Sequence, residues 1–225
     1  MIISIIITFL FNFSYSQEKD SVVKYITPDY NKIEKNIKDK NSKFYYEKLM
    51  KKYKSLDTTM TKDEMKHLYY GSCFQEGYNS YASEDKTREL NELLNKPGHT
   101  KEQLYEILDL ANTILETEKF NMNMYNYMLY AYEQLKDRES FDKVKYILLL
   151  LYSTLIESGD GLSCESAFHV LYTYNEYNIL SFIGFRHTSQ ALSGECDILM
   201  IEANEFKIDQ LFFNISRFNM NLFDE

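Results

Sequence analysis

The stretch SFDKVKYILLLLYSTLIESGDG, residues 140–161, decides the fold because the periodicity of the chain changes at its end. Five apolar side chains recur in it at helical spacing: Val144, Ile147, Leu148, Leu151 and Leu155. Apolar residues cover so much of the circumference that a helix over residues 140–158 is predicted to be buried. Gly159 is predicted to end this helix in the left-handed conformation, which glycine adopts readily.

Upstream of this stretch, the chain repeats apolar side chains every three to four positions, which is typical of amphipathic helices. Two capping boxes mark helix starts: Thr61 stands three residues before Glu64, and Thr100 stands three residues before Gln103. Helices joined by short turns over residues 101–158 predict a helical-hairpin array that resembles degenerate tetratricopeptide repeats. An irregular helical bundle is the alternative, because the repeat signature lacks its Trp and its terminal Pro.

Downstream of Gly159, the sequence changes to short runs of β-favouring residues. Four strands are predicted, at residues 167–173, 177–185, 196–202 and 210–215. The three residues between the first two runs have the length of a hairpin connection, so we expect a small antiparallel sheet covered by the helix over 140–158. The sequence thus predicts an α+β fold, with an N-terminal helical-hairpin array followed by a small antiparallel β-sheet.

The first residues have the features of an export signal. Residues 2–13 form a mostly apolar run, shorter than the roughly 20 residues that span a bilayer, and small side chains follow at Ser14 and Ser16. We predict a signal peptide over residues 1–16 and a soluble protein that is periplasmic or secreted. A buried N-terminal strand or helix is the alternative. No later segment is apolar over enough residues to span a membrane.

The chain has 225 residues and a formal net charge of -9, with 44% hydrophobic and 26% charged residues, which is a globular composition. It excludes a disordered chain, a collagen-like fibre and a disulfide-dense mini-protein. We predict a helical domain over residues 17–158 and a β subdomain over residues 159–225, packed on the last helix. Lysines outnumber acids only between Lys24 and Lys66, 12 against 7, which indicates a solvated helical face rather than a nucleic-acid surface.

The cysteines and histidines predict no metal or cofactor site. Cys164 and Cys196 lie 32 residues apart in the predicted sheet, where they form either a disulfide or two buried thiols. Cys73 is expected in the helical core. No Cys-x-x-Cys, His-Glu-x-x-His, phosphate loop, dinucleotide fingerprint or nucleophile elbow occurs. Whether the protein is an enzyme stays open, and the missing motifs weigh against it.

One aromatic cluster forms the candidate binding site: Tyr69, Tyr70, Gln75, Tyr78 and Tyr81. Tyr69 and Tyr70 are about 100° apart on a helix, so we expect at least one of them to be exposed or to line a groove. Exposed tyrosines offer rigid area with a polar tip for recognition of proteins or glycans. The alternative is that these tyrosines seal the junction between helical hairpins.

Two groups of residues resemble a known family. The first group comprises Phe44–Leu49, Asp57–Thr61, His67–Gly71, Phe74, Gln75 and Tyr78. The second comprises Gly159–Gly161, Ala167–Val170 and the pair Cys196-Asp197. They resemble an uncharacterised family of exported proteins from Bacteroidetes-type bacteria, defined only as a domain of unknown function, over roughly residues 28–216. The resemblance implies an envelope or secreted location and transfers no catalytic residue.

Export, repeat-like helices and the lack of a catalytic motif together predict a non-catalytic module of the cell envelope that binds a protein or peptide. One alternative is a hydrolase of envelope polymers that acts through carboxylates which the sequence does not pair. Another is a glycan-binding module built on the tyrosines, which the absence of Trp disfavours. No nucleic acid, metal ion or cofactor is predicted to bind.

Overall fold

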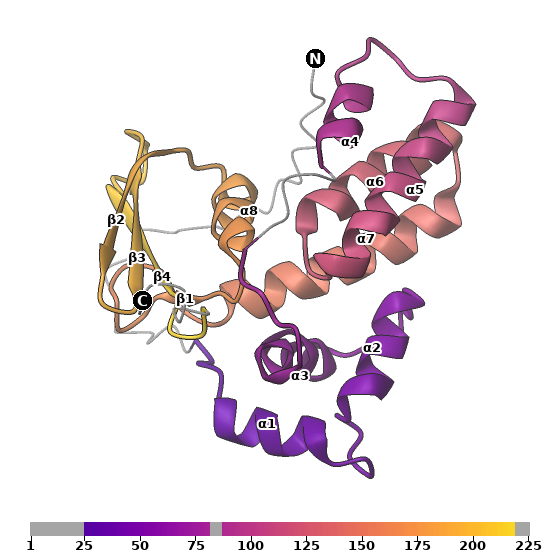
Figure 1. Ribbon diagram of the computed structural model, residues 1–225. Helices are drawn as coiled ribbons and strands as arrows, with labels where there is room; N and C mark the ends of the chain where they lie inside the picture. The colour runs from indigo at the N-terminus through magenta and orange to yellow at the C-terminus, as the bar shows by residue number, and fades with distance from the viewer. Residues whose placement is uncertain (1–24, 82–86, 219–225) are drawn as a thin grey trace, which may run out of the picture.

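The computed structural model describes residues 25–81 and 87–218, so the predicted signal peptide, residues 1–16, lies outside the described residues. The helical region comes first in the chain (Figure 1). Its elements are α1 (Tyr30–Lys38), α2 (Tyr46–Lys54), α3 (Lys62–Gly71), the 3-10 helix η1 (Ser72–Phe74), α4 (Thr87–Leu94), α5 (Lys101–Thr117), α6 (Met122–Leu135) and α7 (Arg138–Ile156).

The second region contains four short strands and one more helix. Its elements are β1 (Phe168–His169), α8 (Thr173–Ile183), β2 (His187–Ser193), β3 (Cys196–Ile201) and β4 (Gln210–Asn214). The predicted α+β class is therefore confirmed, while the likeness to tetratricopeptide repeats stays a prediction. No helix among the described residues combines the length and the apolar character that crossing a bilayer requires.

Local sequence signals place the helices. Both predicted capping boxes are present: the Thr61 hydroxyl accepts from the Glu64 backbone N–H at 3.2 Å, and the Glu64 carboxylate accepts from the Thr61 N–H at 2.7 Å. Thr100 and Gln103 make the same reciprocal pair at the start of α5. The consecutive helices α5, α6 and α7 pack against one another, and α3 packs against α1, α2 and α7. α3 is thereby enclosed on several sides.

The sheet has the strand order β1-β4-β3-β2. β3 runs antiparallel to both of its neighbours, whereas β1 runs parallel to β4, so the prediction of an antiparallel sheet is wrong and the sheet is mixed. β1 is only two residues long, because the predicted strand over 167–173 gives way after His169 to the segment that leads into α8. β2 is one of the two edge strands, and all seven of its residues are exposed.

The predicted strand over residues 177–185 is wrong, and so is the predicted hairpin before it, because α8 occupies this segment. Short apolar runs fit a strand or a buried helix equally well, so contacts with the rest of the fold decide. The first turn of α8 is anchored by Asn175, whose side chain accepts from the Tyr69 hydroxyl at 2.7 Å and donates to the Phe120 carbonyl at 3.2 Å. α8 packs against α6 and α7 (Figure 1).

Gly159 has a different role from the predicted one. α7 already ends at Ile156, and Gly159 is absent from the residues with positive φ. A Cβ atom at Gly159 would lie 2.3 Å from the carbonyl oxygens of both Ser166 and Ala167. Glycine is needed here because two backbone segments approach each other closely. The left-handed conformation falls instead on Gly161, with φ of 70°.

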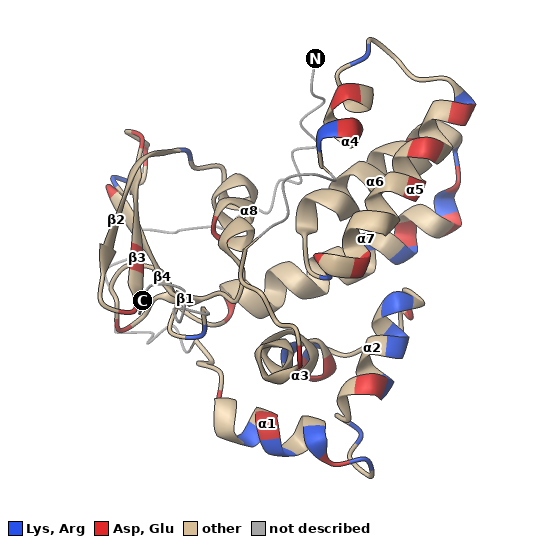
Figure 2. Ribbon diagram, viewed as in Figure 1, with Lys and Arg blue, Asp and Glu red and all other residues tan. Residues whose placement is uncertain are grey.

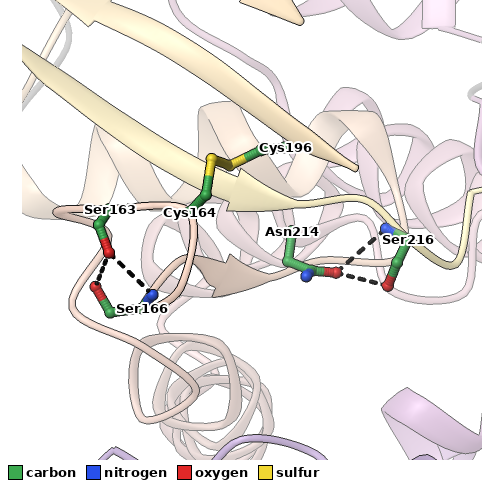
Figure 3. The surroundings of a disulfide bond; sticks show 6 residues. All are labelled: Ser163, Cys164, Ser166, Cys196, Asn214 and Ser216. Atoms are coloured by element: carbon green, nitrogen blue, oxygen red, sulfur yellow. Dashed lines mark hydrogen bonds between the residues drawn. A yellow bond between two sulfur atoms is a disulfide. The ribbon is translucent and has the colours of Figure 1, made fainter. Parts of the chain in front are cut away.

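A disulfide joins Cys164 to Cys196, with a Cα–Cα distance of 5.8 Å (Figure 3). It links the loop after α7 to the first residue of β3. Within that loop, the Ser163 hydroxyl accepts from the Ser166 backbone N–H at 3.3 Å. The Phe212 backbone N–H on β4 donates to the Gly161 carbonyl at 2.9 Å, so the loop is held to the sheet by the disulfide and by a hydrogen bond.

One hydrophobic core includes side chains from both regions. Its largest fully buried members are aromatic: Tyr69, Tyr70, Phe120 and Phe213. The rings of Tyr69 and Phe120 pack edge to face with their centroids 5.3 Å apart. Aromatic packing across α3 and the α5–α6 turn thus fixes the elements that surround the candidate site.

Candidate functional site

A cleft of about 750 Å³ opens beside α2, and we call it the α2 cleft. α2, the segment after η1 and the turn between α5 and α6 all contribute to it. Its principal lining residues are Tyr46, Met50, Lys51, Lys54, Gln75 and Lys119. Three segments that are distant in the sequence thus converge on one surface.

The sequence of α2 explains how the cleft is positioned. Leu49 and Tyr53 face the core, while Lys51 and Lys54 are exposed on the opposite side of the helix. The Tyr53 hydroxyl donates to the Lys119 carbonyl at 2.8 Å. This bond ties α2 to the α5–α6 turn and brings Lys119 to the same cleft as the two exposed lysines.

Gln75 is held at the other side of the cleft. Its side-chain amide donates to the Gly71 carbonyl at 3.2 Å, back onto the end of α3. The floor of the cleft is apolar, because Tyr46 is 8% exposed and Met50 is half-buried. A ligand in the cleft would therefore contact an amide and an apolar floor together.

The rim of the cleft carries more positive than negative charge. Lys51, Lys54 and Lys119 line it together with Glu47 and Glu76. Within the described residues, none of these three lysines forms an ion pair. Figure 2 shows that lysines recur along α1 and α2. The cleft thus presents ammonium groups that protein carboxylates have not neutralised, in a protein of net charge -9.

The predicted tyrosine cluster does not form one surface. Tyr69 and Tyr70 are both fully buried, so the expectation that one of them is exposed is wrong. The enclosure of α3 explains this: the Tyr69 hydroxyl accepts from the Leu171 N–H at 2.9 Å, and the Tyr70 hydroxyl lies 3.2 Å from the carbonyl oxygens of Thr154 and His169. Both hydroxyl groups are used inside the protein.

The other three predicted residues separate from one another. Tyr78 is half-buried and its hydroxyl donates to the Leu171 carbonyl. Tyr81 is 38% exposed, and its ring centroid lies 6.4 Å from that of Phe218. Among the five residues of the predicted cluster, Gln75 alone lines the α2 cleft.

Sequence reasoning missed Tyr46, Lys51, Lys54 and Lys119. The lysine excess between Lys24 and Lys66 was a signal for two of them, but the pattern alone indicates only a solvated face. The position of Lys119 depends on the hydrogen bond from Tyr53, and no local sequence pattern predicts a contact between these two distant residues. Only the fold brings these side chains together.

Cys73, His67 and His169 occupy structural positions. Burial raises the pKa of the Cys73 thiol to about 11, which suppresses the thiolate that nucleophilic chemistry needs. The His67 ring stacks on Phe44 with centroids 3.7 Å apart, and burial lowers its pKa. Burial also lowers the pKa of His169 to about 4. Among the described residues, no group of three or more His, Cys, Asp or Glu side chains could hold a metal ion.

One pair of carboxyl groups lies close together, formed by Glu176 on α8 and Asp197 on β3. These side chains are only 1% and 4% exposed, and neither lines the α2 cleft. A polymer chain in solution cannot reach carboxyl groups buried in this way. The pair therefore gives no support to the alternative of a polymer hydrolase.

Comparisons with known proteins give a family and no activity. The sequence profile of a family described as a domain of unknown function (DUF4919) matches residues 31–222. No curated protein and no solved structure shows significant similarity to the chain.

Proposed function

The chain belongs to the DUF4919 family, and we propose that it is an exported, non-catalytic module that binds a protein or peptide partner in the α2 cleft. The observation that carries this proposal is the cleft itself, with Gln75, an apolar floor and three lysines that form no ion pair with another described residue. Peptide recognition commonly combines an apolar pocket with a few placed polar groups.

The chemistry of the rim defines the partner. Lys51, Lys54 and Lys119 favour carboxylates, while Tyr46 and Met50 favour an apolar side chain. The partner segment is therefore an acidic peptide with at least one apolar anchor. Rim charges of this kind mainly raise the association rate and set specificity, whereas the buried apolar contact supplies most of the affinity.

Two observations support export. The N-terminal sequence resembles a signal peptide, and the chain contains a disulfide between Cys164 and Cys196. Disulfides persist in the oxidising compartments outside the cytosol. A periplasmic or extracellular location is part of the proposal.

Photo-crosslinking tests the proposed site. A photoreactive amino acid at position 75 would be introduced into the full chain, and crosslinked partner peptides recovered from the native envelope would be sequenced by mass spectrometry. We expect peptides rich in Asp and Glu, lost in the variant Lys51→Glu/Lys54→Glu. The variant Lys32→Glu/Lys35→Glu is the matched control, because these exposed lysines have the same spacing on α1 and do not line the cleft.

The control defines the outcomes. Loss of crosslinks in the α2 variant alone supports the site, whereas equal loss in both variants shows a non-specific charge effect. Crosslinks that survive in the α2 variant contradict the site. Turnover of an envelope polymer by the purified protein would contradict the non-catalytic function.

A further inference from the structure

The carboxyl groups of Glu176 and Asp197 meet in the interior where α8 faces the sheet. Glu176 lies in the first turn of α8, and Asp197 follows the disulfide-bonded Cys196 on β3. Each has an oxygen that is buried and has no hydrogen-bond partner among the described residues, Glu176 Oε1 and Asp197 Oδ1. Buried polar atoms are rarely left unpaired, so this pair of oxygens requires an explanation.

The side chains that the structure describes around the pair offer a hydrogen bond rather than an ion pair. Gln190 on β2 donates from its side-chain nitrogen to Asp197 Oδ2 at 2.5 Å, and it also accepts from the Tyr177 hydroxyl at 3.3 Å. His187, also on β2, contacts the Tyr177 ring at 5.0 Å and is exposed. Within the described residues, neither carboxyl group forms an ion pair.

Two carboxylates in this environment would repel each other and would both lack solvation. The N-terminal end of a helix favours a negative charge in its first turn, but this effect is smaller than the cost of burying an unpaired charge. Adjacent buried carboxyl groups therefore retain one proton between them, because like charges at short range cannot both be ionised. The Gln190 amide donates to Asp197 Oδ2, whereas no donor among the described residues reaches Glu176 Oε1, so we place the proton on Glu176.

We propose that Glu176 and Asp197 form a buried proton-binding site, in which one proton shared between Glu176 Oε1 and Asp197 Oδ1 locks α8 onto β3. A carboxylic acid donates and a carboxylate accepts, so a single proton gives both unpaired oxygens a partner. The remaining single charge is stabilised by the Gln190 amide. Burial, together with the charge and hydrogen bonding of Asp197, raises the pKa of Glu176 to about 9.

The site makes folding depend on pH in one direction. An unfolded chain releases the Glu176 proton near its ordinary pKa of 4.5, whereas the folded protein holds it up to about pH 9. Between these values the folded state binds one more proton, so the folded state loses stability as pH rises. The contribution of the site is complete below pH 4.5 and is gone above about pH 9.

The decisive measurement compares denaturant unfolding of the full, oxidised chain with that of Glu176→Gln from pH 5 to pH 9. The variant amide donates to Asp197 without needing a proton. We expect the ratio of the two unfolding equilibrium constants to change by up to tenfold per pH unit, with wild type relatively weaker at high pH. Glu202→Gln is the matched control, because it removes an exposed carboxylate just after β3 and should follow wild type. A constant ratio between wild type and Glu176→Gln would overturn the proposal.

Two further readouts keep the proposal testable if Glu176→Gln does not fold. Infrared spectra of wild type at pH 7 should contain the carbonyl band of an un-ionised carboxylic acid, and its absence would overturn the proposal. Addition of Na⁺ or Ca²⁺ at pH 8, against a chelator control, should leave stability unchanged beyond ordinary salt effects. Saturable stabilisation by either ion would show that a metal cation, rather than a proton, bridges the pair.

Discussion

The helical region, described over residues 25–81 and 87–158, and the sheet region, residues 159–218, are stabilised by different interactions. In the helical region, tyrosine hydroxyl groups on helices donate to backbone carbonyls of the connecting segments, as Tyr53 does to Lys119 and Tyr146 to Met60. The sheet region relies on a disulfide, a close backbone approach and a buried carboxyl pair.

The difference follows from how much apolar surface each region can bury. In the helical region, the described residues form seven α-helices and one 3-10 helix, and they share a core rich in aromatic side chains. The sheet has four short strands and an edge strand, β2, that is exposed along its whole length. A small sheet with an exposed edge strand gains less from burial, so covalent and polar contacts contribute a larger share of its stability.

The largest effect is expected from the disulfide. Cys164 and Cys196 are 32 residues apart, and a cross-link closing a loop of this length stabilises a fold by about 3–4 kcal/mol. We expect reduction, or the variant Cys164→Ser/Cys196→Ser, to lower the free energy of unfolding by this amount.

Native-state hydrogen exchange locates the effect of the disulfide. The backbone amides of β3 and β4 should lose protection from exchange before those of the helices. In Cys73→Ala, a control that retains the disulfide, reduction should cause the same loss. Equal acceleration of exchange in the helices would mean that the two regions unfold as one unit.

The next largest loss of stability is expected from a substitution at Gly159, where the helical region meets the sheet region. In Gly159→Ala the new Cβ would lie 2.3 Å from two backbone carbonyl oxygens, which cannot move aside as a flexible side chain can. Overpacking of this kind costs about 3 kcal/mol. Gly98→Ala is the control, because Gly98 has φ of 77° and open space around it, so only backbone strain of about 1 kcal/mol is expected. Urea unfolding of both variants measures the difference, and equal losses would contradict a steric role for Gly159.

The two regions also differ in how far the sequence predicts them. In the first region, the start of a helix depends on residues that are close in the sequence. The capping pairs Thr61–Glu64 and Thr100–Gln103 each span four residues, and each predicts the start of a helix. In the second region, residues 177–183 favour a strand by composition, but Asn175 and the contacts with α6 and α7 make the segment a helix. β2 was not predicted because a fully exposed strand shows no alternation of apolar and polar residues.

The candidate site was also predictable only in part, because contacts between distant segments of the chain form it. Gln75 was identified from the sequence, but its partners in the cleft come from α2 and from the turn at Lys119. Tyr69 and Tyr70 were misplaced because helical geometry gives the angle between neighbours but not the number of elements that surround the helix. Enclosure is a property of the whole fold, so a local pattern does not reveal it.

A pH titration tests the contact between the regions. His169 on β1 lies beside Tyr30 of α1, with ring centroids 6.2 Å apart, and burial lowers its pKa from 6.5 to about 4. An unfolded chain binds a proton at this residue near pH 6.5, so the folded state loses stability as pH falls from 6.5 to 4, by up to about 1.4 kcal/mol per pH unit. We expect His169→Gln to lack this loss in acid denaturation curves. The exposed His187→Gln should behave as wild type, and an unchanged acid limb in His169→Gln would contradict the prediction.

The smallest change in stability is expected when a hydroxyl group is removed from one of two tyrosines on the same helix. Tyr53 and Tyr46 are both buried on α2, but the Tyr53 hydroxyl donates to the Lys119 carbonyl, whereas the Tyr46 hydroxyl has no partner among the described residues. Tyr53→Phe removes a bond and leaves a carbonyl unpaired, so we expect a loss of about 1 kcal/mol, while Tyr46→Phe should be neutral or slightly stabilising. Because the Tyr53 bond also positions Lys119, Tyr53→Phe should weaken partner binding as well as stability. Urea unfolding and crosslinking at position 75 measure the two effects, and equal behaviour of the variants would show that hydroxyl bonds do not hold the helical region together.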